Sequence, residues 1–383
     1  MSHLSYLEKL LDGVDVEWTT LGNEYAVEIA NSGRKPVKAT LRVAGQTPYY
    51  GANNIQDYVE GYTHDGEFVL IAEDGSASLE NYSIQYARGR FWANNHVHVV
   101  RGKEGLNTRF LYHYLHIVNF IPFLSGGGRA KLTKGKLVDI PLPIPCPDNP
   151  EKSLAIQAEI VRILDAFTAM TAELTAELNM RKKQYNYYRD QLLSFDEDEV
   201  EWKALGKIAE INTGQKPSEI LDTEAEFDYI NAGTTRSGFC ALSNCEGDTV
   251  TTPSRGQGGI GFVGYQNKSF WLGPLCYKIR SIDNKILINK YLFYILQSKN
   301  QLLLGLKKEG GDPAVNKSDL AKLEIPVPSI TEQERIVEIL DKFDTLATSI
   351  QEGLPREIEL RQKQYEYYRD LLLSFPKPEE SAA

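Results

Sequence analysis

The sequence predicts an α+β protein in which two similar globular α/β blocks are joined by two long antiparallel helices, as a tandem repeat with approximate two-fold symmetry. The first observation is that residues 181–195 return at 361–375 with 12 identities in 15 positions, where chance gives about one. The second is a seam of apolar residues, spaced by three and four positions, through 156–195 and 336–375. This spacing is typical of helices that pair as a coiled coil.

The third observation is a series of shorter matches that occur in the same order in both copies. They are 16–18 with 200–202, 31–36 with 212–217, 108–115 with 289–296, 140–143 with 325–328, and 159–167 with 335–343. Between these anchors the second copy has nothing like 55–86, and the first has nothing like 231–261. A shared frame with different contents indicates two modules of one fold that read different targets. An old duplication that drifted without purpose is the alternative.

The repeat divides the chain into six segments. Residues 1–16 contain LEKLL ahead of the first VEW, just as RDQLL precedes the second VEW. This N-terminal helix fragment therefore completes a cyclic repeat and can lie beside the second helix. The remaining segments are a block at 17–150, a spacer helix at 151–199, a block at 200–328, a spacer helix at 329–376 and a tail at 377–383.

The two predicted helices have features that set their length. At about 40 residues each, they would reach about 60 Å, which suits a spacer between the blocks. Thr331 and Glu334 resemble a capping box at the start of the second helix. Gly353 and Pro355 should bend or break that helix near its middle. The first helix contains TAEL twice in tandem at 171–178, and a four-residue unit is close to one helical turn.

The charge of the chain bears on DNA binding. The net charge of −10 argues against tight DNA binding by this chain alone. The acidity lies in the helical segments, since 151–202 has 6 basic and 11 acidic residues and 329–383 has 7 and 12. Within 100–136 there are seven basic residues and one acidic residue. Local basic patches are thus available, and a partner should supply much of the charge that neutralises DNA phosphates.

Composition also indicates a compartment. The sequence has no run of 18 apolar residues and no basic region followed by an apolar one at its start, so neither a membrane span nor a signal peptide is expected. The four cysteines form no C-x-x-C pair. We therefore expect a cytoplasmic protein with reduced thiols.

Motifs for catalysis are few. Gly256, Gly258 and Gly261 match the dinucleotide fingerprint, but the FVGYQNKSFW that follows is strand-like and opens no helix. There is no phosphate-binding P-loop, no tetrapeptide of the adenine methyltransferases and no paired nucleophile and base. His96 and His98 lack a third matched ligand, so no metal site is expected. The sequence therefore predicts recognition rather than catalysis.

The repeat of a variable block and a long helix resembles the specificity subunit of type I restriction-modification systems. The TAEL tandem, the segment 143–165 and the paired YNYYRDQLLSF and YEYYRDLLLSF resemble the type IC branch in particular. The resemblance covers nearly the whole chain. It implies a non-catalytic subunit whose two blocks are target recognition domains that read a bipartite, asymmetric site on double-stranded DNA.

The resemblance also implies partners and cofactors. Two modification subunits would carry S-adenosylmethionine and the adenine methylation chemistry, and restriction subunits would use ATP and Mg, so this chain itself would bind no cofactor. Two hypotheses from other classes remain beside it. A solitary methyltransferase or nuclease would need the motifs that are missing, and a coiled-coil adaptor would bind no nucleic acid.

Two sets of residues are candidates for binding. DNA contacts are expected from polar side chains of the blocks, above all in the matched turns, where glycine lets the backbone come close and lysine or arginine can reach phosphate. In the first block these are Arg34, Lys35, Arg88, Arg90, Arg129, Lys131 and Lys134, and in the second Gln215, Lys216, Arg236, Arg255, Gln257, Asn316 and Lys317. The tyrosines of the helix ends are either coiled-coil core or partner contacts. They are Tyr185, Tyr187, Tyr188, Tyr365, Tyr367 and Tyr368.

Overall fold

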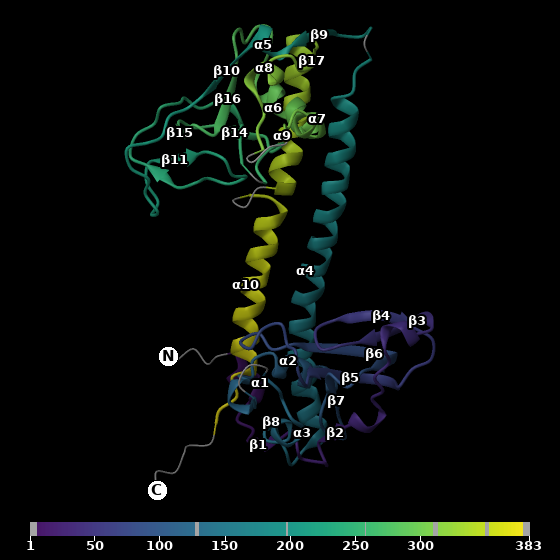
Figure 1. Cartoon of the computed structure of the whole chain (residues 1–383). Coiled ribbons are helices and arrows are strands. Elements are labelled where there is room, and N and C mark those ends of the chain that lie inside the picture. The colour runs from purple at the N-terminus through teal and green to yellow at the C-terminus, as the bar shows by residue number, and fades with distance from the viewer. Residues whose placement is uncertain are drawn as a thin grey trace, which may run out of the picture. The chain divides into compact units, whose positions relative to one another are not determined.

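The computed structural model describes residues 6–126, 130–196, 198–256, 258–308, 313–348 and 352–377. The chain divides into two compact units, one formed by 1–174 with 358–383 and the other by 175–357. Each unit contains one globular block of strands and short helices together with parts of the long helices (Figure 1). Among the described residues, no helix is long and apolar enough to cross a membrane.

The first unit is built on a six-stranded sheet in the order β2-β7-β5-β6-β3-β4. Its strands are β2 (Val27–Ile29), β3 (Ala44–Tyr50), β4 (Ile55–Val59), β5 (His64–Ala72), β6 (Ile84–Ala93) and β7 (Val97–Gly102). The long antiparallel pair β5–β6 forms its centre, and Phe68 to Ala72 of β5 are fully or nearly fully buried. The two-stranded ribbon β3–β4 joins β6 through a short parallel pairing of Tyr49 with Trp92 and lies at the edge of the block (Figure 1).

Helices and a second, small sheet cover this unit. They are α1 (Tyr6–Leu11), β1 (Val16–Thr20) paired with β8 (Pro141–Pro145), α2 (Thr108–Leu115), α3 (Lys134–Leu137), the first part of α4 (Pro150–Leu192) and the last part of α10 (Leu354–Leu373). Asn107 caps α2, because its side chain accepts from the N–H groups of Arg109 and Phe110. Buried residues of α1, α4 and α10 share one core with α2, and Phe110 packs edge-to-face on Phe375.

The second unit distributes its strands over three smaller sheets. Their orders are β10-β16-β13-β14, β12-β11-β15 and β17-β9. The strands are β9 (Glu201–Ala204), β10 (Ala209–Thr213), β11 (Phe227–Ile230), β12 (Phe239–Cys240), β13 (Thr249–Pro253), β14 (Gly264–Gln266), β15 (Trp271–Leu272), β16 (Cys276–Ser281) and β17 (Glu324–Val327). The helices are α5 (Leu205–Ile208), α6 (Asn289–Ser298), α7 (Asn300–Gly305), α8 (Lys317–Leu320) and α9 (Ile330–Thr348).

The frame of the first unit recurs in the second. The pair β9–β17 repeats β1–β8, and α6 repeats α2 as a largely buried helix that contacts the sheet. The ribbon β11–β12 is joined to β15 by a parallel pairing of Tyr229 with Trp271, as β3–β4 is joined to β6. The duplication in the sequence is therefore a duplication of topology, down to the strand pairing of the edge ribbon.

The long helices differ in continuity. Helix α4 runs unbroken from Pro150 to Leu192, whereas the second helical segment is divided into α9 and α10. The break expected near Gly353 is confirmed, since this residue has a φ of +83° and precedes α10. The capping box expected at Thr331 is wrong. A cap at Thr331 would start the helix at 332, whereas α9 begins two residues earlier, at Ile330. Ser329 Oγ accepts the Glu332 N–H at 3.3 Å, because a serine hydroxyl satisfies a free N–H of the first turn.

Each unit contains a short stretch of paired helices. In the first, Phe167 of α4 stacks on Tyr368 of α10 with ring centroids 5.3 Å apart. In the second, Tyr188 of α4 stacks on Phe343 of α9 at 5.6 Å. The apolar seam that the sequence predicts is therefore filled by aromatic pairs at matched places of the repeat.

Candidate nucleic-acid interface

Each long helix is attached to its block by a buried glutamine at a matched position of the repeat. On α4, Gln157 accepts the Asn107 N–H at 2.8 Å and donates to the Gly105 carbonyl at 2.9 Å. On α9, Gln333 makes the same two kinds of bond, each 2.9 Å long, to the backbone at 286–288. Neither side chain has exposed surface. These bonds fix the loop before the block helix against the long helix.

In the first unit, Asp165 on α4 ties the long helix to α2. Its Oδ1 accepts from Arg109 Nε at 2.9 Å and from His113 Nε2 at 2.7 Å. Burial by itself would raise the pKa of Asp165, but these hydrogen bonds outweigh it and lower the pKa. Burial of the imidazole lowers the pKa of His113 to about 4. A neutral histidine therefore donates to a charged carboxylate at neutral pH.

The second unit holds the matched carboxylate, Asp341 on α9, with different side chains. Tyr294 donates to Asp341 Oδ1 at 2.5 Å, and Lys290 Nζ lies 3.4 Å from the same atom. Burial and the hydrogen bond to Asp341 raise the pKa of Tyr294. The aspartate therefore occurs at the same position in both units, although the side chains that it binds differ. The contact between the long helix and the block helix is thus a shared feature of the two copies.

The two matched turns, 31–36 and 212–217, are anchored in the same way. Trp92 Nε1 donates to the carbonyl of Lys35 at 2.7 Å, and Trp271 Nε1 donates to the carbonyl of Gln215 at 2.8 Å. The side chains of Lys35, Gln215 and Lys216 are exposed. Each turn is therefore held through its backbone by an indole, which leaves its polar side chains available to a ligand.

Arg34 of the first turn faces inward instead. Its Nη1 lies 2.6 Å from Glu73 Oε2 and 2.8 Å from the carbonyl of Val97. Lys131 Nζ lies 3.0 Å from the other oxygen of Glu73. Burial would raise the pKa of Glu73, but the hydrogen bonds from Arg34 and Lys131 outweigh it and lower the pKa. Arg34 thus stabilises the turn from within, and Lys131 is the member of this cluster that reaches solvent.

In the second unit the turn meets a lysine directly. Lys317 Nζ donates to Asn212 Oδ1 at 3.2 Å. Asn316 precedes it with an exposed side chain, and Arg255 is exposed in the loop after β13. In both units, therefore, the structure brings a lysine, Lys131 or Lys317, to the matched turn. The two matched turns, each with its neighbouring lysine, are therefore the parts of the candidate interface that occur in both copies of the repeat.

The remaining candidates of the first block lie elsewhere. Arg88 and Arg90 project from β6 on the exposed face of the sheet. Arg88 pairs with Glu67 and Arg90 with Asp65 across the β5–β6 pair, both at 3.2 Å. Lys134 is exposed at the start of α3. The structure therefore spreads the basic candidates over several surfaces of the first block.

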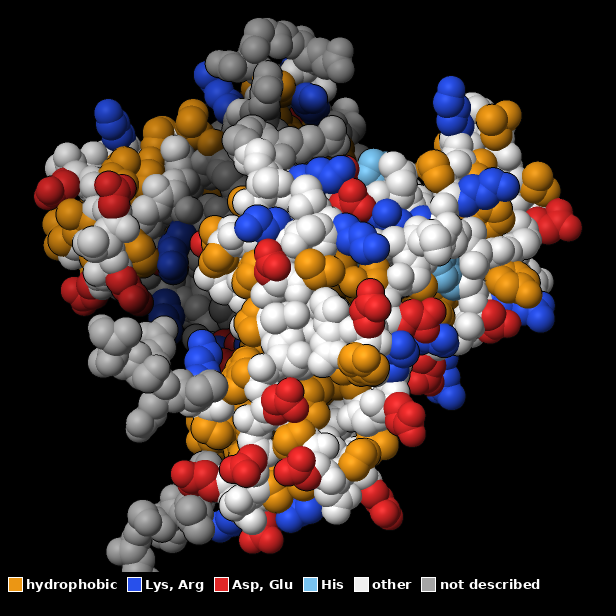
Figure 2. Space-filling view, turned by 90° about the horizontal axis from the view of Figure 1, so that it is seen from below, with side chains coloured by type: hydrophobic (Ala, Val, Ile, Leu, Met, Phe, Trp, Pro, Cys, Tyr) orange, Lys and Arg blue, Asp and Glu red, His pale blue; other side chains and the backbone are white. Residues whose placement is uncertain are grey.

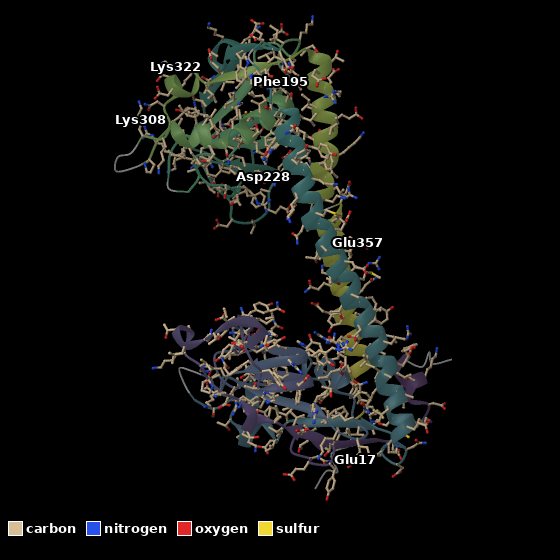
Figure 3. All side chains as sticks on the ribbon, turned by 90° about the vertical axis from the view of Figure 1, so that its right-hand side faces the viewer. Glu17, Phe195, Asp228, Lys308, Lys322 and Glu357 are labelled. Carbon is tan, nitrogen blue, oxygen red and sulfur yellow. The ribbon has the colours of Figure 1, made fainter. Side chains whose placement is uncertain are left out.

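Charges of both signs are mixed on the surface. Figure 2 shows Lys and Arg side chains interspersed with Asp and Glu over the face that it draws. In the second block, Lys308 and Lys322 lie on one flank (Figure 3). The hydrogen bond from Lys308 lowers the pKa of Asp319, and the charges of Lys308 and then Lys322 lower it further. The candidates Arg129 and Gln257 lie outside the described residues.

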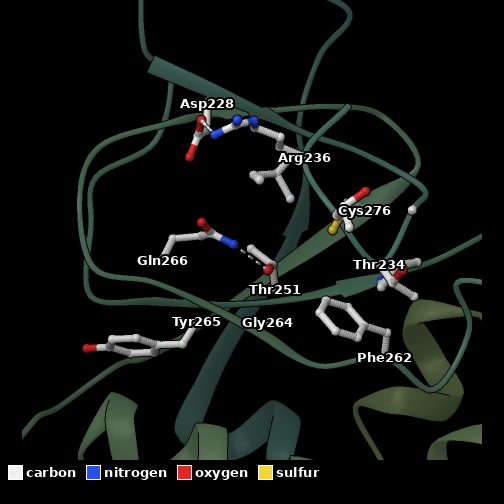
Figure 4. Close-up of a pocket in the computed structure, with 13 residues that line it drawn as sticks. Asp228, Thr234, Arg236, Thr251, Phe262, Gly264, Tyr265, Gln266 and Cys276 are labelled. Atoms are coloured by element: carbon white, nitrogen blue, oxygen red, sulfur yellow. Dashed lines mark hydrogen bonds and ion pairs between the residues drawn. The ribbon is translucent and has the colours of Figure 1, made fainter. Parts of the chain in front are cut away.

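The second block also has an open concavity of about 520 Å³ beside β13 and β14 (Figure 4). Its rim carries Arg236 and Asp228, whose Nη1 and Oδ1 atoms are 3.6 Å apart. Within it, Gln266 Nε2 donates to Thr251 Oγ1 at 3.2 Å. A Cβ on Gly264 would lie 2.8 Å from that hydroxyl, so a larger residue there would displace the Thr251 side chain. Arg236 and Thr251 belong to the part of the second copy that the first copy lacks.

Three polar residues of the edge ribbons were missed by sequence reasoning. They are Arg42 and Asp57 in the first block and Asp228 in the second. Each sits in an ion pair that depends on the pairing of β3 with β4 or of β11 with β12. No motif or local spacing marks them, because register between strands is not visible in the sequence.

Four of the six tyrosines pack in the coiled coil or the core. Tyr185 is buried and donates to Gln297 Oε1 at 3.3 Å, and Tyr365 packs against the core of the first unit. Tyr188 and Tyr368 stack on the phenylalanine rings of the paired helices. These four rings therefore make packing contacts or hydrogen bonds within the chain.

Two tyrosines face outward. Tyr187 has 62% and Tyr367 has 64% of its surface exposed, and each meets its neighbouring tyrosine edge-on at about 5 Å. They are matched positions of the repeat. A large aromatic ring held rigidly on a helix surface is typical of a protein contact.

Among the described residues, no group of three or more His, Cys, Asp and Glu is placed to hold a metal ion. The four cysteines are free, and burial raises the pKa of Cys276 to about 12. A buried thiol with a raised pKa is a poor nucleophile.

A family model and curated relatives match this chain. The family described as the type I restriction modification DNA specificity domain matches residues 16–181 and 197–360. A putative type I restriction enzyme specificity subunit of Haemophilus influenzae is 47% identical over 403 residues, which cover 97% of this chain and 98% of that protein. The specificity subunit of the type I restriction enzyme EcoR124I/EcoR124II of Escherichia coli is 39% identical over 416 residues, covering 99% of both.

Solved structures share the fold. The crystal structure of a type I restriction-modification S subunit from M. genitalium aligns with a TM-score of 0.66 at 17% identity, and covers 96% of this chain and 98% of that one. A chain from a study of complex assembly in the type I R-M system aligns with a TM-score of 0.55 at 16% identity, and covers 94% and 98%. At these identities the likeness concerns the fold.

Proposed function

We propose a mode of action for this chain from the premise that it belongs to the family of type I restriction-modification DNA specificity subunits. A specificity subunit recognises DNA and is not itself catalytic, and this role prevails over that of a coiled-coil adaptor without nucleic-acid binding. We infer that the chain reads a bipartite, asymmetric site on double-stranded DNA, one half with each block. The type IC branch is the one that its TAEL tandem and helix ends favour.

One observation carries the bipartite reading. The joints between helix and block are kept at matched positions, as Gln157 with Gln333 and Asp165 with Asp341. The segments that these joints hold differ in sequence, and the strands that correspond between the two blocks differ in length. Two modules that recognise different DNA sequences from the same scaffold need this combination: the same joint to the long helix and a different recognition surface.

We propose that the exposed side chains of the matched turns contact the DNA backbone. Lys35 and Lys216 extend from turns whose backbones are fixed by indoles, and Lys131 and Lys317 lie next to these turns. Lysines on rigid loops position a protein on phosphates without reading sequence. Arg88, Arg90, Lys134, Gln215, Arg236, Arg255 and Asn316 remain candidates for further DNA contacts, and Arg34 supports the first turn from within.

We propose that Tyr187 and Tyr367 dock two modification subunits. The matched exposed rings stand in stretches that are nearly identical in sequence, and identical surfaces take identical partners. Two copies of the modification subunit per chain follow from two copies of the stretch. Restriction subunits then join this core. S-adenosylmethionine, ATP and Mg bind to the partner subunits in this scheme.

The function is tested by mapping adenine methylation in cells that produce this chain with its modification subunit. We expect methylation at one asymmetric motif of two defined halves and an undefined spacer of fixed length. Methyl transfer to DNA by the highly purified chain alone, or methylation without any two-part motif, would contradict the proposal. Tyr187→Ala and Tyr367→Ala should each remove one modification subunit from the purified complex, as measured by native mass spectrometry, whereas Lys182→Ala on the same helix should not.

A further inference from the structure

The two edge ribbons carry the same three-residue arrangement, although their sequences do not align. In the ribbon β3–β4, Asp57 lies directly opposite Tyr49, and the guanidinium of Arg42 lies over the Tyr49 ring at 4.1 Å. Arg42 Nη1 is also 3.3 Å from Asp57 Oδ2. An arginine is thus stacked on an aromatic ring of one strand and paired with the aspartate across from it.

In the ribbon β11–β12 the strands exchange these roles. Asp228 lies directly opposite Phe239, the guanidinium of Arg236 lies over the Phe239 ring at 4.4 Å, and Arg236 pairs with Asp228 at 3.6 Å. The aspartate precedes its aromatic partner here and follows it in the first block. Because the arrangement recurs without sequence correspondence, common descent of these particular residues does not account for it.

Exposure shows which groups the ribbons present. Arg42 is largely covered, with 15% of its side chain exposed, whereas Asp57 is 44% exposed. In the second block Arg236 is 56% and Asp228 45% exposed. Large apolar side chains stand beside the first ribbon, namely Leu41, Val43 and Tyr58, and Leu242 stands beside the second. The first ribbon therefore presents Asp57 beside exposed apolar side chains, and the second presents both members of its pair with Leu242 nearby.

Resting on the proposed function, we propose that these two ribbons enter the major groove and that their arginine–aspartate pairs read base edges. The major groove admits a two-stranded β-ribbon. Arg236 would donate both of its forked N–H groups to guanine O6 and N7, while Asp228 accepts from the amino group of cytosine. In the first block, Asp57 is the presented group, and it accepts from the amino group of cytosine or adenine. The exposed apolar side chains suit thymine methyl groups.

The geometry favours a role of the arginine–aspartate pairs in contacting DNA bases over a role in stabilising the ribbons alone. At 3.6 Å the pair in the second ribbon attracts without a hydrogen bond, so the guanidinium keeps its donors for a ligand. Stacking on Phe239 holds the guanidinium plane in place before DNA arrives, which reduces the entropy lost on binding. The aspartates also repel phosphate, which suits a pair that faces base edges rather than the backbone.

The test uses the full chain assembled with its modification subunit, and the readout is the methylated motif across a library of randomised sites. Arg236→Lys keeps the charge but loses the forked donors. We expect one guanine in the half-site read by the second block to become variable, with discrimination reduced roughly tenfold to a hundredfold, and the other half unchanged. Asp57→Asn should relax one position in the half-site read by the first block only. The unchanged half in each case reports that the complex is folded and assembled.

Matched controls are ion pairs of the same blocks outside the ribbons. They are Arg280→Lys, whose partner Glu246 lies 2.8 Å away, and Glu28→Gln, whose partner Arg101 lies 2.6 Å away. Both should leave the motif unchanged. An unaltered motif in Arg236→Lys and Asp57→Asn, a uniform loss at all sites with unchanged preference, or the absence of a G·C pair from the second half-site would overturn the inference. Failure of the wild-type complex to methylate a two-part motif would instead refute the proposed function itself.

Discussion

At the scale of single residues, the account depends on a few buried polar groups that join helix to block. Gln157 and Gln333 each use both ends of their buried amides on backbone groups of the loop before the block helix. An amide in such a position is costly to replace, because the loss leaves the backbone donor and acceptor unsatisfied.

Gln333→Leu should therefore destabilise the second unit strongly. The change leaves the Ile288 N–H and the Ile286 carbonyl without their partner, at a cost of about 3 kcal/mol. Gln191→Leu, at an exposed position of α4 in the same unit, should change stability by less than about 0.5 kcal/mol. Denaturant unfolding followed by hydrogen exchange in each unit measures both. Equal effects of the two substitutions would count against a structural role for Gln333.

The histidines predict a difference in acid sensitivity between the units. All six histidines precede residue 117, so the second unit has none. Burial holds the pKa of His113 at about 4 in the folded state, below its usual value in the unfolded chain. Between these values the unfolded chain binds the proton and the folded chain does not, so stability is present above about pH 6.5 and is lost as the pH falls toward 4.

We expect the first unit to lose about 2 kcal/mol from His113 alone between pH 7 and pH 5. The variant His113→Tyr carries the residue found at the matched position, Tyr294, and should lose this part of the pH dependence. Hydrogen exchange at both pH values, corrected for intrinsic rates, measures each unit separately. Equal acid sensitivity of the two units would show that the buried imidazoles are not responsible.

At the level of residues, the sequence located structural features only where the repeat supplied a constraint, and the DNA contacts expected there stay a prediction. The turns that contain Lys35 and Lys216 could be found because both copies keep them. Arg34 could not be assigned to an internal pair, since its partner Glu73 is 39 positions away and only the fold brings the two together. The same holds for Arg42, Asp57 and Asp228, whose arrangement depends on strand register.

At the scale of elements, the long helices show how much a periodic pattern determines. Their apolar seam and the glycine at 353 were sufficient to predict two long helices and the break in the second. The start of α9 was misassigned by two positions, because Ser329 and Thr331 both offer a capping hydroxyl and local sequence does not decide between them. Strand pairing within the blocks was not predictable, since it joins residues far apart in the chain.

Gly353→Ala should disturb the junction between α9 and α10. The backbone there is left-handed, with a φ of +83°, and a Cβ would lie 2.5 Å from the carbonyl oxygen of Thr345. We expect a loss of about 1–3 kcal/mol. Gly305→Ala is the matched control, because a Cβ there meets nothing within 4 Å. Thermal unfolding of both variants measures the effect. An equally small change in the unfolding temperature of both variants would contradict a strained junction.

Helix α4 also makes a prediction about spacing. A third TAEL inserted after Leu178 adds four residues, or about 6 Å of helix, against about 3.4 Å per base pair of DNA. We expect the spacer of the methylated motif to lengthen by one, at most two, base pairs, with both half-sites unchanged. An unchanged spacer, or altered half-site bases, would show that these helices do not measure DNA.

At the scale of the whole molecule, one chain supplies two recognition modules, two helix–block joints and two exposed tyrosine sites. The net charge of −10 fits a subunit that reads bases while its partners neutralise much of the DNA backbone. In the proposed scheme, the repeat lets a single chain organise two copies of a partner around an asymmetric site. In that scheme, the repeated frame binds the partners, and the two different blocks bind the two halves of the DNA site.

The central claim is that each block reads one half of the site independently of the other. Exchanging 17–150 for the corresponding block of a relative, and mapping adenine methylation in cells that also produce the modification subunit, tests it most directly. The account predicts that one half-site changes, while the other half and the spacer length stay as they were. A change in both halves, in a complex that still methylates DNA, would contradict it.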